Sequence, residues 1–161
     1  MLFRSEKAEY MAAATTFLRT GTANMATLPF KRKRILVVDD SETILHVICT
    51  LLEHHKLANV VGRAESGPEA INRVQELRPE LVLLDADMPG MSGLRTALLL
   101  SQLHADIEVV LMSMDTSTPF RAACVGCGAA AMIYKPKFLK ELRTFLQKPL
   151  PKAPSAMRLG A

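Results

Sequence analysis

Carboxylates follow two short apolar segments of this 161-residue chain. Asp39 and Asp40 come directly after one apolar run, and Asp85 comes directly after another, with Asp87 two residues further on. An unpaired charge at the end of a buried strand is costly, because burial removes its hydration. A cation or a chemical task must therefore hold these carboxylates in place.

A hydroxyl and an ammonium group stand in the same kind of position. Ser113 follows a third apolar run, and Lys135 follows a fourth. The carboxyl ends of parallel strands share one edge of a sheet, so all of these groups would converge there. Neighbouring carboxylates raise one another's pKa, and a hard divalent cation such as Mg²⁺ removes that penalty. The spacing therefore predicts an acidic Mg²⁺ site with Ser113 and Lys135 beside it.

The elements that must position these residues are short apolar runs alternating with segments of helical periodicity. The predicted strands are residues 35–38, 60–62, 81–84, 108–112 and 131–134. The predicted helices start at Ser41, Ser66, Ser92, Thr118 and Phe138. Serine favours helix N-caps, and proline in the first turn supports two of these starts. Five strands alternating with five helices predict an α/β fold, a doubly wound parallel sheet covered on both faces.

The composition, with 49% hydrophobic and 22% charged residues, is typical of a soluble globular domain. No apolar run approaches the roughly 18 residues that a membrane-spanning helix needs. Charged residues occupy the N-terminal stretch where a signal peptide requires an apolar one. Three cysteines without disulfide-type spacing fit a reducing compartment. We therefore expect a cytoplasmic protein with no membrane span.

The formal net charge of +4 is unevenly distributed. Residues 1–34 hold seven Lys and Arg against two Glu, residues 35–147 hold ten against fourteen acids, and residues 148–161 hold three and no acid. The basic run Lys31–Arg34 could contact nucleic acid. It abuts a predicted strand, however, and has no aromatic residue among its cations, so a solvated linker is the favoured interpretation.

The motifs and their order along the chain resemble the receiver domain of two-component response regulators, over about residues 34–147. The resemblance rests on the acidic pair, the DxxMPxMxG pattern that begins at Asp85, Ser113 after an apolar strand, and the pair Lys135–Pro136. The intervals of 45, 28 and 22 residues between them also suit the family. The resemblance implies a flavodoxin-like fold with five helices and the strand order 2-1-3-4-5.

By this resemblance, Asp85 is the phosphoacceptor. Asp40 and Asp85, with the backbone carbonyl of Asp87, are expected to bind Mg²⁺, and Asp39 is expected to help directly or through water. The bland alternative, that Asp85 only ends a strand and caps a turn, leaves the nearby cation and acidic pair unexplained.

The resemblance also assigns a switch. Ser113 would hydrogen-bond the phosphoryl oxygens, and Lys135 would pair with them. The residue three before the lysine is usually a Tyr or Phe that moves on activation, but Met132 stands there in this chain. Tyr134 lies next to the lysine instead.

The expected partners are a sensor histidine kinase or histidine phosphotransfer protein, and a downstream protein. The downstream protein would dock on the face made by the fourth predicted helix, the fifth strand and the fifth helix. Only fourteen residues follow Gln147, so the sequence predicts a stand-alone receiver with no DNA-binding domain, and it leaves a homodimer open. We expect no enzyme activity beyond slow self-catalysed phosphorylation and dephosphorylation. A phosphorelay intermediate or phosphate sink is the runner-up.

A phosphatase of the haloacid dehalogenase type is a further alternative. The stretch LLDADM is similar to the DxD motif of those enzymes, in which the first Asp is the nucleophile. Those enzymes place the motif on their first strand and need an acidic pair beyond the lysine. Here only Glu141 follows Lys135, so the alternative is disfavoured.

The two ends of the chain are predicted to lie outside the receiver domain. Residues 1–33 form an N-terminal extension, in which residues 5–21 have the periodicity of one amphipathic helix before a basic linker. Met25 is a plausible alternative start. Residues 148–161 contain Pro149, Pro151 and Pro154, and this composition predicts a disordered tail.

Overall fold

The computed structural model describes residues 32–147. Within them, a five-stranded parallel sheet has the order β2-β1-β3-β4-β5. The strands are β1 (Arg34–Val38), β2 (Asn59–Ala64), β3 (Leu81–Asp85), β4 (Glu108–Ser113) and β5 (Ala131–Tyr134). The predicted sheet and its order are confirmed. Strand β2 is longer than the predicted 60–62, because its pairing with β1 extends to Ala64.

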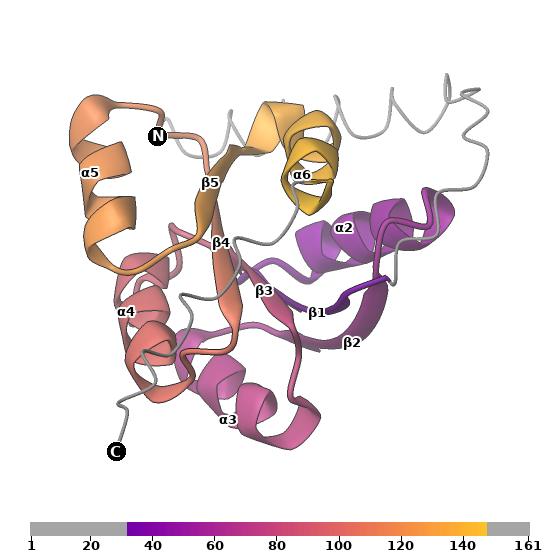
Figure 1. The fold of residues 1–161 in the computed structure, drawn as a ribbon, viewed down its shortest axis with the longest axis horizontal. Helices are drawn as coiled ribbons and strands as arrows, with labels where there is room; N and C mark the ends of the chain where they lie inside the picture. The colour runs from indigo at the N-terminus through magenta and orange to yellow at the C-terminus, as the bar shows by residue number, and fades with distance from the viewer. Residues whose placement is uncertain (1–31, 148–161) are drawn as a thin grey trace, which may run out of the picture.

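Among the described residues, five α-helices and one 3₁₀ turn connect the strands and follow the last one (Figure 1). They are α2 (Glu42–His54), α3 (Gly67–Leu77), α4 (Gly93–Leu103), α5 (Thr118–Gly126), η1 (Lys135–Lys137) and α6 (Phe138–Leu146). The hydroxyls of Ser66, Ser92 and Ser117 accept from backbone N–H groups three residues on, as N-cap side chains do. Ser41 precedes α2 without a side-chain cap, and its backbone N–H donates to Asp39.

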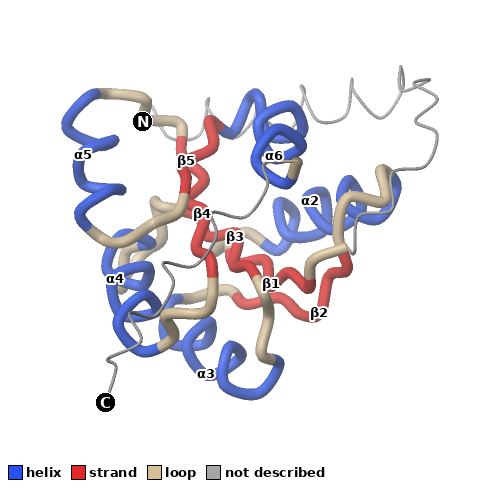
Figure 2. The backbone as a smooth tube through the Cα atoms, viewed as in Figure 1, coloured by secondary structure: helices blue, strands red, loops and turns tan. Residues whose placement is uncertain are grey.

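Helices cover both faces of the sheet (Figure 2). On one face α2 and α6 pack against the sheet side that includes Ile35, Val37 and Leu83. On the other face α3, α4 and α5 pack against the side that includes Leu36 and Leu84. Residues that alternate along one strand therefore enter two different cores, which explains why the central strands are continuously apolar.

The N-terminal end of the sheet holds part of the predicted linker. Lys33 forms an ion pair with Glu108 and lies over the Phe145 ring. The backbone N–H of Arg34 donates to Glu80 at 2.9 Å. Lys33 is half-buried, because a carboxylate and an aromatic ring contact it, so it is not a solvated linker residue. Arg34 is exposed and begins β1. The predictions for residues 1–31 and 148–161 lie outside the described residues.

The membrane prediction can be tested within residues 32–147. No helix in that range is both long enough and apolar enough to cross a bilayer.

Candidate functional site

Four polar side chains are almost completely buried at the carboxyl ends of the strands. Asp39 follows β1, Asp85 ends β3, Ser113 ends β4 and Lys135 follows β5. Their exposed fractions are 0% for the first three and 5% for the lysine. The parallel sheet thus brings together, at one edge, residues that are up to 96 positions apart in the sequence.

Lys135 is the counter-ion of this cluster. Its Nζ lies 2.8 Å from Oδ1 of Asp85 and 3.3 Å from Oδ2 of Asp39. Lys135 is the first residue of η1, which lies between the end of β5 and the start of α6. One buried cation therefore neutralises part of the charge of two buried carboxylates.

The pKa values reflect this crowding. Burial, followed by repulsion from Asp85, raises the pKa of Asp39 to about 6, although Lys135 opposes the shift. Burial disfavours the charged form of Lys135, but attraction to Asp85 and Asp39 outweighs it, so the lysine pKa lies above its ordinary value. The site therefore holds more carboxylates than cations, and its lysine is protonated.

The carboxylates fit a divalent metal ion. Asp39, Asp40 and Asp85 each offer an oxygen, and these oxygens lie within 4.8 Å of one another. Oδ2 of Asp85 is buried and has no hydrogen-bond partner among the described residues. An oxygen-only, acidic donor set of this kind suits Mg²⁺, which also keeps several water ligands.

Asp87 has a different place from the other acids. Its backbone N–H donates to Oδ1 of Asp85 at 3.2 Å, and its carboxylate faces Ser113, whose hydroxyl lies 3.5 Å from Oδ2. Burial and then repulsion from Asp85 raise the pKa of Asp87. Its carboxylate is not a member of the three-acid cluster; metal binding through its backbone carbonyl stays a prediction.

Two further residues shape the site, although the sequence had assigned them no role. Asp115 donates its backbone N–H to the Ser113 hydroxyl at 3.0 Å, and its carboxylate accepts from Ser117 at 2.7 Å, so it orders the loop after β4. A Cβ on Gly93 would lie 2.1 Å from the backbone oxygen of Asp85. Two features of the sequence point to these residues: Asp115 is an acid two positions after Ser113, and Gly93 is the last residue of the DxxMPxMxG pattern.

The predicted switch position is half-buried. Met132 packs against the core on the α3–α5 side of the sheet, whereas its neighbour Ile133 is buried on the α2–α6 side. Tyr134 donates its backbone N–H to the Glu141 carboxylate at 2.8 Å. That Tyr134 lies on the same side as Met132 stays a prediction from strand alternation.

Comparisons with known proteins identify the family. Residues 35–147 match the model of the response regulator receiver domain, so the chain belongs to that family.

Curated relatives agree with this assignment. The chain is 38% identical over 109 residues to response regulator GacA of Pseudomonas protegens, a match that covers 68% of this chain and 51% of GacA. It is 32% identical to response regulator UvrY of Escherichia coli K12, covering 63% and 46% of the two chains. The chain thus spans about half the length of these relatives.

A solved structure with the same fold is the response regulator domain of Thermotoga maritima CheB. It superposes with a TM-score of 0.64 at 24% identity, covering 74% of this chain and 99% of that domain. The family assignment also disfavours the dehalogenase-type alternative, because the acid of the DxD stretch ends β3 and not β1.

Proposed function

We propose that this chain is a phosphoacceptor of a two-component pathway, with Asp85 as the phosphorylated residue. The observation that carries the proposal is the buried contact of Lys135 with Asp85 and Asp39 beside the Ser113 hydroxyl. A phosphohistidine of a kinase or phosphotransfer protein is the donor.

In the transfer step, a carboxylate oxygen of Asp85 forms a bond to phosphorus as the phosphorus–nitrogen bond of the donor breaks. The electron pair of the broken bond remains on the donor imidazole. Catalysis of such a transfer consists mainly of positioning and charge neutralisation. Oδ1 of Asp85 is engaged by Lys135 and by the Asp87 N–H, whereas Oδ2 has no such partner among the described residues.

Each neighbour then has a task. Lys135 pairs with the phosphoryl oxygens, and Ser113 turns its hydroxyl from Asp87 toward them. Asp39, Asp40 and Asp85 are the residues that would hold Mg²⁺, joined by the backbone carbonyl of Asp87. When bound, Mg²⁺ supplies positive charge that offsets the repulsion between the carboxylates and the incoming phosphoryl group.

Signalling follows from protein docking on the α5–β5–α6 face, the surface formed by these three elements. The proposal includes a cytoplasmic location and no turnover of external phosphate esters. Of the nine residues of α5, only Cys124 is buried, so this helix offers most of its surface to a partner.

The test uses beryllium fluoride and a small phosphodonor such as phosphoramidate on the wild type and on Asp85→Asn. We expect Mg²⁺-dependent modification of the wild type and none of the variant. Asp115→Asn is the matched control, because it removes one acid beside the site and leaves the acceptor in place. Modification that persists in Asp85→Asn, or in the absence of divalent ions, would contradict the assignment.

A transfer assay with labelled phosphate refines the role. Label that moves from a kinase to this chain and stays there supports an output-triggering receiver. Label that moves onward to a phosphotransfer protein assigns the relay role instead.

A further inference from the structure

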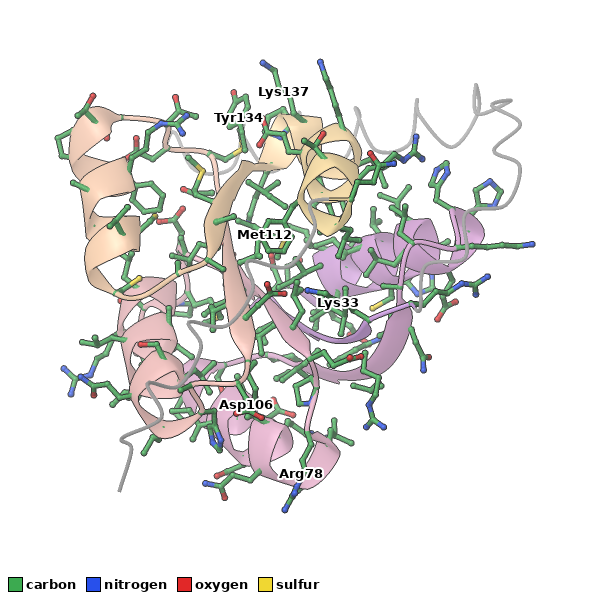
Figure 3. All side chains as sticks on the ribbon, viewed as in Figure 1. Lys33, Arg78, Asp106, Met112, Tyr134 and Lys137 are labelled. Atoms are coloured by element: carbon green, nitrogen blue, oxygen red, sulfur yellow. The ribbon has the colours of Figure 1, made fainter. Side chains whose placement is uncertain are left out.

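A cavity of about 360 Å³ lies on the α5–β5–α6 face, and its wall comes from these three elements and from η1. Its volume is within the range of pockets that bind small molecules, and it can accept a few side chains of a partner protein. Figure 3 labels Tyr134 and Lys137 at the junction of β5 with η1. We call this cavity the β5 groove.

The cations of the β5 groove lie toward the carboxyl ends of the strands. Lys137 belongs to η1, directly after β5, and Lys140 lies in the first turn of α6. Arg121 lies near the start of α5, the helix that follows the end of β4. Three separate elements therefore bring positive charges to one end of the groove.

The opposite end of the groove is apolar. Phe145 lies in the last turn of α6, and its ring contacts Lys33, which is neutralised by its ion pair with Glu108 at the start of β4. This contact places Phe145 toward the amino ends of the strands. Ala131 and Met132 of β5 add further apolar surface to the wall. The groove thus runs from an apolar end to a cationic end.

The charge of the groove is not balanced within residues 32–147. In that range, Arg121, Lys137 and Lys140 form no ion pair with a carboxylate. Glu141 is the one acid among the described residues that line the groove, and its carboxylate already accepts the backbone N–H of Tyr134 at 2.8 Å. Residues 35–147 hold fourteen acids against ten cations, so this surplus of positive charge is local. A local surplus of this kind is complementary to an acidic partner.

The length of the groove favours a peptide over a small anion. Lys140 and Phe145 are five residues apart on α6, which corresponds to about 8 Å along the helix. A single inorganic anion is too small to occupy both ends. A peptide segment of about three extended residues spans them.

We propose that the β5 groove binds an acidic segment of the downstream protein, in which a large apolar or aromatic side chain adjoins several carboxylates. The apolar side chain packs beside Phe145 and Met132. The carboxylates pair with Arg121, Lys137 and Lys140. A buried anchor of this kind supplies most of the affinity, and the charges supply orientation and a fast encounter. The proposal rests on the docking role proposed for this face and adds the chemistry of the partner.

The test selects a random library of short peptides, displayed on phage, on the full-length wild type with Mg²⁺ and beryllium fluoride present. We expect the enriched peptides to carry carboxylates beside an aromatic or large aliphatic residue. Each enriched peptide is then synthesised and titrated into ¹⁵N-labelled protein. It should shift the amide signals of Met132, Lys140 and Thr144 and leave those of α3, on the other side of the molecule, unchanged.

Two matched variants test the charge match. Lys140 and Arg95 are both exposed, and each is the third residue of its helix, but Arg95 lies on α4, outside the face. Lys140→Glu should weaken binding of the enriched peptides about tenfold, because an attraction becomes a repulsion. Arg95→Glu changes the net charge equally and should change the Kd by less than about twofold. A peptide with one acid replaced by Lys should regain affinity for Lys140→Glu.

Several results would overturn the inference. They are a selection that enriches no peptide, enriched peptides without acids, amide shifts outside the groove, and equal weakening by the two variants. Groove signals that shift when the protein alone is diluted would assign the groove to a second copy and also overturn it.

The same spectra separate this inference from the phosphoacceptor proposal. Beryllium fluoride should shift the amide signals of Asp87 and Ser113, which lie beside Asp85. If these signals shift and no acidic peptide binds, only the inference about the groove fails. If these signals do not shift, the phosphoacceptor proposal fails.

Discussion

The acceptor site and the α5–β5–α6 face use charge in opposite ways. At the acceptor site, Asp39, Asp85 and Lys135 are buried and contact one another directly. On the face, Lys137 and Lys140 are exposed. Buried charges are poorly screened and depend on their partners, whereas exposed charges interact through water at small cost.

This difference separates two tasks within one sheet. The acceptor site must hold mutually repelling groups in place before the phosphoryl group arrives, and the energy for this comes from the surrounding core. In the proposed function, the face must bind and release a partner protein, so each of its contacts must be weak. We therefore expect large effects of single substitutions at the site and small effects on the face.

The largest effect is expected for Lys135→Met in EDTA. Removing the cation leaves two buried carboxylates without a counter-charge, and we expect a loss of about 3 kcal/mol in the free energy of unfolding. Adding Mg²⁺ should recover part of the loss. Lys137→Met, two residues away and exposed, is the matched control and should change stability by less than about 0.5 kcal/mol. Urea unfolding measures both; equal effects would contradict the contrast between site and face.

Asp39→Asn is expected to have the next largest effect, and it should raise the free energy of unfolding rather than lower it. The folded pKa of about 6 lies above the unfolded value near 3.9, so the native state binds more protons between these pH values. The free energy of unfolding in EDTA should therefore fall as pH rises from about 4 to 6, by up to about 3 kcal/mol.

The Asp39→Asn variant removes this titrating group and keeps an oxygen that can accept from Ser41. It should be more stable than the wild type at pH 7 in EDTA and lack that pH dependence, while its Mg²⁺ affinity falls. Thermal unfolding from pH 4 to 8 measures this. A parallel pH profile in the two proteins would show that Asp39 is not the group that titrates.

Gly93→Ala should destabilise the fold by about 1–3 kcal/mol. The added Cβ would meet the backbone oxygen of Asp85, the last residue of β3, at 2.1 Å and the Cα of the next residue, Ala86, at 2.6 Å. Helix α4 must therefore move away from the strand that carries Asp85. Gly126→Ala is the control, because no atom lies within 4 Å of its added Cβ. Unfolding curves should separate the two variants; equal curves would mean that the site tolerates the shift.

The sequence predicted the fold well because its signals are local. Short apolar runs, serine caps and helix-opening prolines each depend on a few neighbouring residues. The convergence of Asp39, Asp85, Ser113 and Lys135 also followed, because a parallel sheet aligns all strand ends at one edge.

The remaining features depend on pairs of residues that are distant in the sequence. The anchoring of Lys33 by Glu108 and Phe145 joins the start of β1 to β4 and α6. The contact of the Asp87 carboxylate with Ser113 joins the loops after β3 and β4. No local pattern specifies these contacts, so the sequence favours a linker for the basic run and indicates only metal binding for Asp87.

The smallest effect is expected for Met132→Tyr, which tests how strongly the acceptor site and the face are coupled. Met132, the second residue of β5, is half-buried on the side of the sheet that faces α4 and α5. Methionine is unbranched and has three side-chain torsions, so it can repack with little rotamer strain when Ser113 moves. We therefore expect weak coupling between the acceptor site and the face, with part of the active surface already populated before phosphorylation.

The measurement follows amide shifts of α5 and α6 by NMR as beryllium fluoride is added. The Tyr variant should show larger shifts, because an aromatic ring must move in or out as one body, whereas Met132→Leu should behave as the wild type does. If the wild type already shifts as far as the Tyr variant, the acceptor site and the face are strongly coupled and the expectation is wrong.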